Sequence, residues 1–294
     1  MDITNLKIRD MRKLLDSKEI SAAELACSYI DRIEKYDGKL ESYITVTKEK
    51  ALLDAENAQK RIDSGNAPEL CGIPIAVKDN ICTDGIKTTC ASKMLENFIP
   101  PYNATVMEKL YSKGIVLLGK TSMDEFAMGG STQTSAFAKT KNPYDIKKVP
   151  GGSSGGSASC VSASLCAASL GSDTGGSIRQ PASFCGVTGL KPTYGRVSRY
   201  GLIAFASSLD QIGPVAKDAH DCGIILNAIA GYDRHDGTAS KNPTIDYTYA
   251  IGKSMKGVKI ALPKEFYGEG IDREVADAVI AAAKKYEEMG AELI

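Results

Sequence analysis

The stretch that decides the fold runs from Pro150 to Ala182 and reads PGGSSGGSASCVSASLCAASLGSDTGGSIRQPA. It contains two glycine–serine clusters, at residues 151–156 and 173–177, separated by a segment of alanine, serine, cysteine and leucine. A flexible linker would be rich in glycine and serine throughout, whereas this middle segment is apolar enough to pack. We therefore expect the glycines to set backbone geometry, because glycine accepts positive φ and lets another group approach the main chain closely.

The composition around this stretch is that of an ordinary globular protein. Of the 294 residues, 43% are hydrophobic, which is enough for a sizeable core. The 36 basic residues balance the 36 acidic ones, so net charge gives no argument for a nucleic-acid-binding surface. No apolar run approaches the roughly 20 residues of a membrane span, and the first residues lack the apolar core of a signal peptide. These features predict a cytoplasmic protein.

The eight cysteines form no C-x-x-C pair and show no metal-ligand spacing with the two histidines. In a chain with no export signal, such cysteines behave as small hydrophobic residues. We expect them to be reduced and mostly buried, and we expect no metal site.

Apolar runs that alternate with helical patterns predict an α/β fold. Strands are expected at residues 71–77, 115–118 and 168–170. The prediction is a mixed, largely parallel central sheet flanked by helices. Residues 1–65 are expected to form a helical segment that packs on the core, and residues 66–294 to form the α/β core, effectively as one domain.

Other segments give local expectations. The sequence Ser21-Ala-Ala-Glu24 is a capping box that opens a helix, which should stop near Gly38. A short helix is expected at residues 122–128. Residues 187–215 are expected to be loop-rich, and the polar residues 232–256 to form a surface excursion or a boundary.

The first cluster matches G-x-S-x-G, with Ser153 or Ser154 in the middle, which is the pattern of an α/β-hydrolase nucleophile elbow. Such an elbow needs a buried strand directly before it. The preceding residues 145–150, DIKKVP, are charged and end in proline, which disfavours the elbow. Neither cluster has the Gly-Lys-Ser/Thr ending of a phosphate loop or fits G-x-G-x-x-G.

The candidate general base is a lysine, because His220 and His235 both lie in polar surroundings typical of solvated surface residues. Lys78 directly follows the apolar residues 75–77. The pKa of a lysine, ordinarily near 10.4, must fall several units before the amine can accept a proton at neutral pH, and burial lowers it. A lysine at a strand end can also extend to solvent, and this segment alone leaves that alternative open.

Ser177 is a better candidate nucleophile than Ser153 or Ser154. The backbone N–H groups of the three preceding residues, Thr174, Gly175 and Gly176, can turn toward one point and bind the oxyanion of a tetrahedral intermediate.

Two further roles complete this candidate site. Ser153 could lie between Lys78 and Ser177 and relay the proton. Asp173 and Arg179 flank the nucleophile, and we expect this pair to hold the loop rather than take part in the chemistry.

Three patterns together resemble the amidase signature family. They are Ile75-Ala-Val-Lys-Asp-Asn80, Gly151-Gly-Ser-Ser-Gly-Gly-Ser157 and Asp173-Thr-Gly-Gly-Ser-Ile-Arg-Gln-Pro-Ala182. The resemblance implies the amidase signature fold and a Ser–cisSer–Lys triad. Members of this family run well beyond 294 residues. The resemblance therefore implies that the sheet is incomplete at the C-terminus. It also implies that the residues that bind the substrate, glutamine in the members most like this chain, lie in the missing part.

Transferred onto this chain, the triad would consist of Ser177 as the acyl-ester nucleophile, Ser153 as the serine preceded by a cis peptide bond, and Lys78 as the base. The family commonly has Met-Gly-Ser-Ser where this chain has Met128-Gly-Gly-Ser131. The expected substrate loop is therefore Gly129, Gly130 and Ser131, with no hydroxyl at position 130.

The chain looks most like the glutamine-hydrolysing subunits of tRNA-dependent amidotransferases. That likeness implies a heterotrimer with a B-type and a small C-type subunit. Glutamine would be hydrolysed here, and the ammonia would pass to the B-type partner, which would amidate misacylated Glu-tRNA(Gln) or Asp-tRNA(Asn). ATP and Mg²⁺ would be used by that partner, with no cofactor in this chain. The alternatives are a stand-alone amidase that acts on other carboxamides and a non-catalytic, truncated subunit.

Overall fold

The computed structural model describes residues 2–294, which form two compact units, one up to Thr248 and one from Tyr249 to Ile294. The helices of the expected N-terminal segment, residues 1–65, lie in the same unit as the sheet. A single domain through residue 294 was expected, whereas the chain divides into two compact units after Thr248. The division falls within residues 232–256, the polar stretch expected to be an excursion or a boundary.

Residues 2–248 of the first unit contain six strands and seven α-helices. The strands are β1 (Tyr43–Val46), β2 (Pro74–Lys78), β3 (Val116–Thr121), β4 (Ala168–Asp173), β5 (Thr188–Gly189) and β6 (Gln211–Ala216). The α-helices are α1 (Ile8–Asp16), α2 (Ala22–Leu40), α3 (Lys48–Asp63), α4 (Thr105–Ser112), α5 (Gly155–Ser162), α6 (Arg179–Phe184) and α7 (Ala219–Ile229). Short 3-10 turns are η1 (Ile3–Asn5), η2 (Lys93–Leu95) and η3 (Glu125–Ala127).

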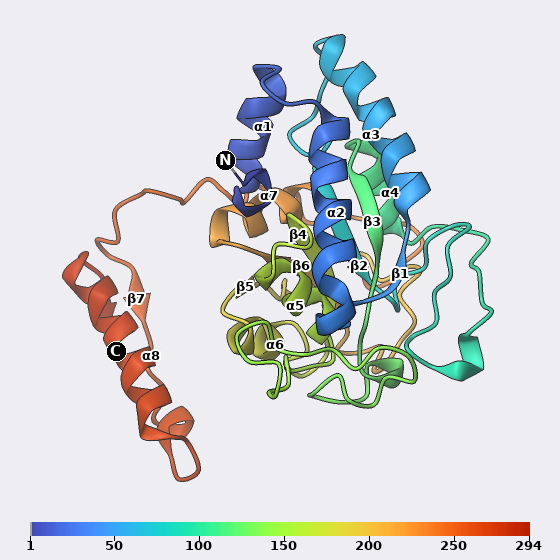
Figure 1. Ribbon diagram of the computed structural model, residues 1–294. Helices are drawn as coiled ribbons and strands as arrows, with labels where there is room; N and C mark the ends of the chain where they lie inside the picture. The colour runs from blue at the N-terminus through green and yellow to red at the C-terminus, as the bar shows by residue number, and fades with distance from the viewer. Residues whose placement is uncertain (1) are drawn as a thin grey trace. The chain divides into compact units, whose positions relative to one another are not determined.

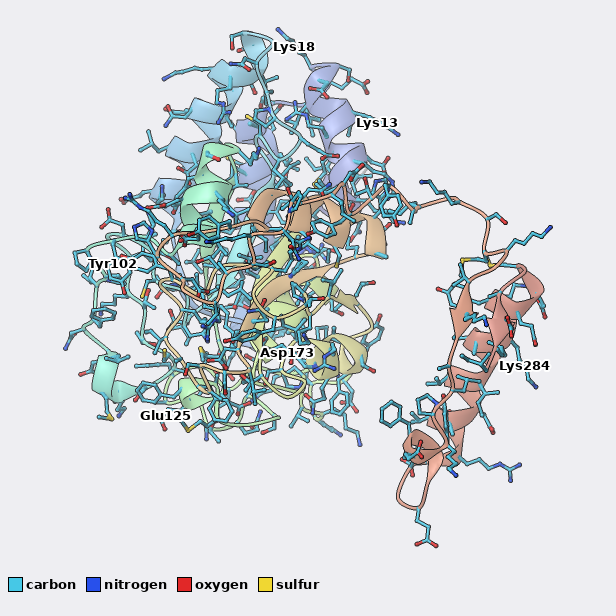
Figure 2. All side chains as sticks on the ribbon, turned by 180° about the vertical axis from the view of Figure 1, so that it is seen from behind. Lys13, Lys18, Tyr102, Glu125, Asp173 and Lys284 are labelled. Carbon is cyan, nitrogen blue, oxygen red and sulfur yellow. The ribbon has the colours of Figure 1, made fainter. Side chains whose placement is uncertain are left out.

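The strands form one mixed sheet in the order β1-β3-β2-β4-β6-β5. β2 is parallel to both β3 and β4, whereas β1 is antiparallel to β3, and β6 is antiparallel to β4 and β5. Four strands, β2 to β5, therefore run in one direction, as the expected largely parallel sheet requires. α2 lies over the face of the sheet seen in Figure 1, and α4 and α7 over the face seen in Figure 2.

The core of this unit consists of the buried faces of the strands and the helices packed on them. β2, β3 and β4 are buried along their whole length, which is typical of central strands covered on both faces. The capping box of α2 is present, with Ser21 Oγ accepting from Glu24 N and Ser21 N donating to Glu24 Oε2. Helix α2 passes through Gly38 and ends at Leu40, because Glu41 adopts the left-handed conformation that stops it.

One expectation about the first unit is wrong. The segment expected as a helix at residues 122–128 is only the single turn η3, because the Asp124 carboxylate binds Thr132 and Thr134 and holds the chain in a loop. The segment 187–215 is loop-rich, as expected, but it also contains β5 and most of the buried strand β6. Gly213 and Pro214 lie inside β6 and hide its strand pattern.

The second unit contains β7 (Lys259–Ile260), the turn η4 (Lys264–Tyr267), α8 (Arg273–Glu288) and β8 (Glu292–Leu293). β7 and β8 pair in parallel. None of the helices formed by residues 2–294 has the length and hydropathy that a membrane crossing requires.

All eight cysteines are free, and every one except Cys27 is buried. The expectation of reduced, mostly buried cysteines is therefore confirmed.

Candidate active site

The site begins at the end of β2, where Lys78 is fully buried. Its Nζ lies 2.7 Å from Ser153 Oγ, 2.9 Å from Ser172 Oγ and 3.4 Å from the Ser172 carbonyl oxygen. The alternative in which Lys78 extends to solvent is therefore wrong, because the side chain is fully buried and its amine lies against Ser153 and Ser172.

The burial of Lys78 determines its protonation state. Loss of solvation disfavours the ammonium and lowers the pKa of Lys78 to about 7, although Asp124, Cys90, Asp173 and Asp210 act in the opposite direction. A substantial share of the side chain is therefore uncharged at neutral pH, and an uncharged amine can accept a proton.

Ser153 comes from the loop before α5 and is fully buried. The peptide bond between Gly152 and Ser153 is cis. The Ser153 carbonyl accepts from Asp124 N at 3.2 Å, and the Gly152 N–H donates to Gln180 Oε1 at 2.8 Å. These contacts fix the loop on both sides of the cis bond, so the Ser153 hydroxyl is held against Lys78.

The elbow interpretation of the first cluster is not supported by this geometry. No strand precedes the cluster directly, since residues 143–152 are turns and loop. Ser154 is fully buried, and its hydroxyl donates to the Ser172 carbonyl oxygen at 3.1 Å. Neither serine of this cluster has the exposed hydroxyl that an elbow nucleophile needs.

Ser177 lies in the second cluster, half-buried, just before α6. Its carbonyl accepts from Ser154 N at 3.1 Å, which ties the two clusters together. Within residues 2–294 its hydroxyl makes no hydrogen bond, so the structure joins Lys78 to Ser153 but shows no hydrogen bond from Ser153 to Ser177. Ser177 Oγ is accessible and free of intramolecular partners, as an attacking oxygen must be.

The backbone N–H groups that are free to bind an oxyanion near Ser177 differ from the expected set, residues 174–176, at one position. Gly176 N–H donates to Asp173 Oδ1 at 2.8 Å and is therefore occupied. The N–H groups of Thr174, Gly175 and Ser177 find no acceptor in the described part of the chain. These three donors, rather than residues 174–176, are the ones available for a developing oxyanion.

Asp173 and Arg179 form the expected pair. The guanidinium binds the buried carboxylate at both oxygens, at 3.0 and 3.1 Å, and Ile178 N donates to it as well. Burial raises the pKa of Asp173, but the hydrogen bonds from Arg179, Ile178 and Gly176 outweigh this effect, so the pKa lies below its ordinary value. The carboxylate thus stays ionised and holds the loop that carries Ser177; Figure 2 labels Asp173 at the end of the unit opposite Lys13 and Lys18.

The loop of Gly129, Gly130 and Ser131 lies beside this pair of clusters. Gln180 Nε2 donates to the Gly130 carbonyl at 3.0 Å, and Ser131 N donates to Asp124 Oδ2 at 3.1 Å. A Cβ at Gly130 would meet only Gln180 Nε2, at 3.6 Å, so the position has room for a serine side chain.

Sequence reasoning missed Ser172, Asp124 and Gln180. Ser172 lies near the end of β4, the parallel neighbour of β2. Its hydroxyl, close to the same edge of the sheet as Lys78, was the signal that could have predicted the contact. Asp124 and Gln180 bind the backbone of loops that lie away from them in the sequence. A single sequence contains no spacing that predicts such contacts.

The two histidines lie away from these groups. His220 Nδ1 is 3.0 Å from Arg9 Nη1, and His235 Nδ1 is 3.1 Å from Asp233 Oδ1. Neither ring bonds to Lys78, Ser153 or Ser177 anywhere in residues 2–294.

His220→Ala and His235→Ala are therefore expected to leave amide turnover within about twofold of the unsubstituted chain, since neither imidazole can act as the base. Steady-state ammonia release measures this. An inactive His220 variant would instead restore the serine–histidine alternative.

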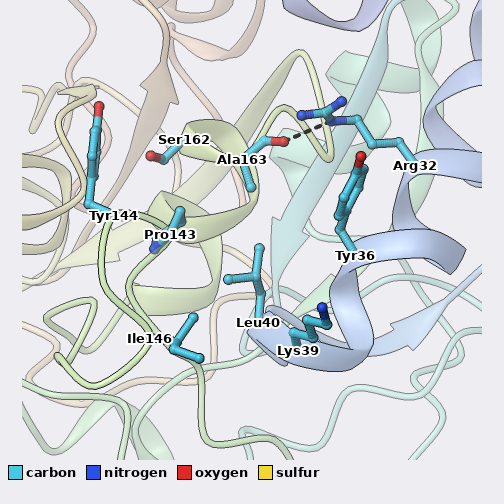
Figure 3. A pocket seen from close by; sticks show the side chains of 9 residues that line it. All are labelled: Arg32, Tyr36, Lys39, Leu40, Pro143, Tyr144, Ile146, Ser162 and Ala163. Atoms are coloured by element: carbon cyan, nitrogen blue, oxygen red, sulfur yellow. Dashed lines mark hydrogen bonds between the residues drawn. The ribbon is translucent and has the colours of Figure 1, made fainter.

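A cavity of about 380 Å³ lies between the C-terminal half of α2 and the loop that carries Tyr144, and its lining side chains are drawn in Figure 3. Arg32 Nε donates to the Ala163 carbonyl at its rim, at 2.9 Å. None of the residues of the candidate active site lines this cavity, so the cavity is not part of that site. No cluster of three or more histidine, cysteine or carboxylate side chains in residues 2–294 could hold a metal ion.

Comparison with known families matches residues 24–294 to the family described as Amidase. The chain belongs to this amidase family, as the three motifs indicated. It is similar to the A subunits of glutamyl-tRNA(Gln) amidotransferase: those of Ruminiclostridium cellulolyticum and Caldanaerobacter subterraneus are 59% and 55% identical over 294 residues, 100% of this chain and 60% of each relative. The chain thus spans about 60% of the length of these curated relatives.

Solved structures agree with this assignment. The chain superposes on the A subunit of glutamyl-tRNA(Gln) amidotransferase from Thermotoga maritima with a TM-score of 0.88 and 44% identity, over 99% of this chain and 61% of that one. It also superposes on the native peptide amidase of Stenotrophomonas maltophilia with a TM-score of 0.90 and 33% identity, over 98% of this chain and 61% of that one.

Proposed function

We propose that this chain carries the amide-hydrolysing centre of the ammonia-supplying subunit of a tRNA-dependent amidotransferase, acting in the cytoplasm. The observation that carries the proposal is the 2.7 Å approach of a buried lysine amine, Lys78 Nζ, to Ser153 Oγ. The identity of 53–59% to subunits named for this reaction supports the substrate, glutamine.

In the first half of the reaction, Lys78 accepts the proton of Ser153, and Ser153 accepts the proton of Ser177. The Ser177 oxygen attacks the carboxamide carbon of glutamine, and the carbonyl oxygen becomes an oxyanion. The free N–H groups of Thr174, Gly175 and Ser177 donate to that oxyanion. The proton returns from Lys78 through Ser153 to the leaving nitrogen, which departs as ammonia and leaves an acyl ester on Ser177.

In the second half, water attacks the ester. Lys78, again through Ser153, takes the proton of the water and returns it to the Ser177 oxygen, which releases glutamate. The ammonia passes to a B-type partner, which activates the misacylated tRNA with ATP and Mg²⁺, and a small C-type subunit completes the complex. This division of labour is part of the proposal and needs no cofactor in this chain.

Ammonia release from glutamine, measured with and without the partner subunits, ATP and misacylated tRNA, tests the proposal. Strong stimulation by the complete set is the expected result. Hydrolysis of glutamine that is indifferent to all three would contradict the assignment to an amidotransferase.

A second candidate is a stand-alone amidase that acts on other carboxamides. The superposition on a peptide amidase at a TM-score of 0.90 favours it. Partner-independent hydrolysis of peptide or small aliphatic amides, faster than that of glutamine, would support this candidate. The absence of any amide hydrolysis in the complete complex would leave a non-catalytic subunit.

A further inference from the structure

The side chain of Asn80 has no role in the reaction derived above. Asn80 follows Lys78 by two residues, in the turn after β2, and is 1% exposed. Its Nδ2 donates to Ser172 Oγ at 2.9 Å, while its Oδ1 has no partner in the described chain. A buried amide with one unused acceptor is costly to keep for packing alone.

The contact partner of Asn80 explains its position. Ser172 Oγ also lies 2.9 Å from Lys78 Nζ, so one hydroxyl joins the amide to the amine. Ser172 supplies two of the three oxygens around Nζ, and Ser153 supplies the third. Whatever fixes the Ser172 hydroxyl therefore fixes where the lysine amine lies.

The chemistry of Asn80 suits an amine that must stay uncharged. Its N–H group occupies a lone pair of Ser172 Oγ, so that oxygen has less electron density to offer an ammonium. A carboxylate at this position, at most about 6 Å from Nζ because both contacts are 2.9 Å, would instead stabilise the ammonium strongly in a buried site. Asparagine has nearly the same shape as aspartate but brings no charge.

We propose that Asn80 is a positioning residue for amide hydrolysis, which through the Ser172 hydroxyl holds the Lys78 amine against Ser153 without adding a charge beside it. This inference rests on the function proposed above. The other titratable groups that act on Lys78 are Cys90 in the loop after β2, Asp124 after β3, Asp173 at the end of β4 and Asp210 before β6, and all of them remain when Asn80 is changed.

The test is the pH profile of kcat/KM for glutamine hydrolysis by Asn80→Asp, measured with the full chain in its complex. The acidic limb should move up by about one to three pH units, as for a base that gains an opposite charge at 4–6 Å. Activity should be lost at neutral pH and largely return at alkaline pH. Asn66 is exposed, and in the described chain it makes no hydrogen bond to Lys78, Ser153 or Ser177, so Asn66→Asp adds the same charge and should leave the profile unchanged.

Asn80→Ala provides a second readout if the aspartate variant does not fold. It should lower kcat about tenfold, the loss of one positioning hydrogen bond, and change KM less than about twofold. If Asn80 has a merely structural role, either variant should lose the same share of kcat/KM at every pH, and KM should rise as kcat falls. If Lys78→Met is inactive and the Asn80→Asp profile overlays the parent's, only the role of Asn80 is overturned; if Lys78→Met is active, the proposed function itself fails.

Discussion

Replacing Ser177 with alanine is expected to abolish amide hydrolysis, lowering kcat by about 10⁴-fold or more, because the nucleophile and its base act as a unit. Only the oxyanion donors and substrate binding would remain in this variant. The Ser177 hydroxyl has no hydrogen-bond partner within residues 2–294, so its removal leaves no buried polar group unpaired and should not change thermal stability. Steady-state ammonia release and a thermal melt measure the two expectations.

A covalent probe separates loss of the nucleophile from loss of binding. A glutamine analogue that acylates the enzyme should label the parent chain on Ser177 and should not label Ser177→Ala, as intact-mass spectrometry would show. Ser183→Ala is a matched control, because Ser183 is exposed in the adjoining helix α6 and this variant should be labelled normally at Ser177. Retained labelling of Ser177→Ala would rule out this nucleophile.

Lys78→Met is expected to lower kcat by about 10³-fold or more, since methionine fills the space of the lysine stem but accepts no proton. The parent profile should rise through the pKa of Lys78, at about pH 7, because only the uncharged amine accepts the proton of Ser153. The pH–rate profile of both chains measures this. A loss smaller than about tenfold would mean that another group acts as the base.

The same substitution should change how stability depends on pH. Burial lowers the pKa of Lys78 from 10.5 to about 7, so between these values the unfolded chain binds a proton that the folded chain does not. Stability therefore rises with pH across this window and is lowest below it, where the buried amine is charged. Denaturant unfolding at about pH 7 and about pH 10 should show this rise in the parent and not in Lys78→Met.

Much of the fold could be predicted from the sequence because the central strands are continuous apolar runs. The position of Lys78 at the end of one such run predicted either a buried amine or a lysine that extends to solvent, and did not decide between them. β6 could not be predicted, because Gly213 and Pro214 are residues that ordinarily exclude a central strand. The division into two units was expected only as one of two interpretations of residues 232–256, because the strand and helix patterns that follow resemble those of the core.

The candidate site was predictable in its chemical groups but not in their contacts. The register of β2 against β4, Val77 opposite Leu170, brings Ser172 to Lys78, and a single sequence does not contain that register. The occupied N–H of Gly176 has a local cause instead, because the Asp173 carboxylate three residues earlier accepts from it and is a stronger acceptor than a backbone carbonyl. Pairings across loops, such as Gln180 with Gly152, also had no local signal.

The central claim is that an uncharged amine on Lys78 accepts a proton inside the protein, and an NMR titration tests it most directly. Lysines labelled with ¹³C at Cε are followed as pH is raised, and Lys78 is assigned as the resonance that is missing from Lys78→Met. The account predicts a midpoint at about 7 for this resonance, well below those of the exposed lysines. A midpoint near 10.5, together with the other lysines, would contradict it.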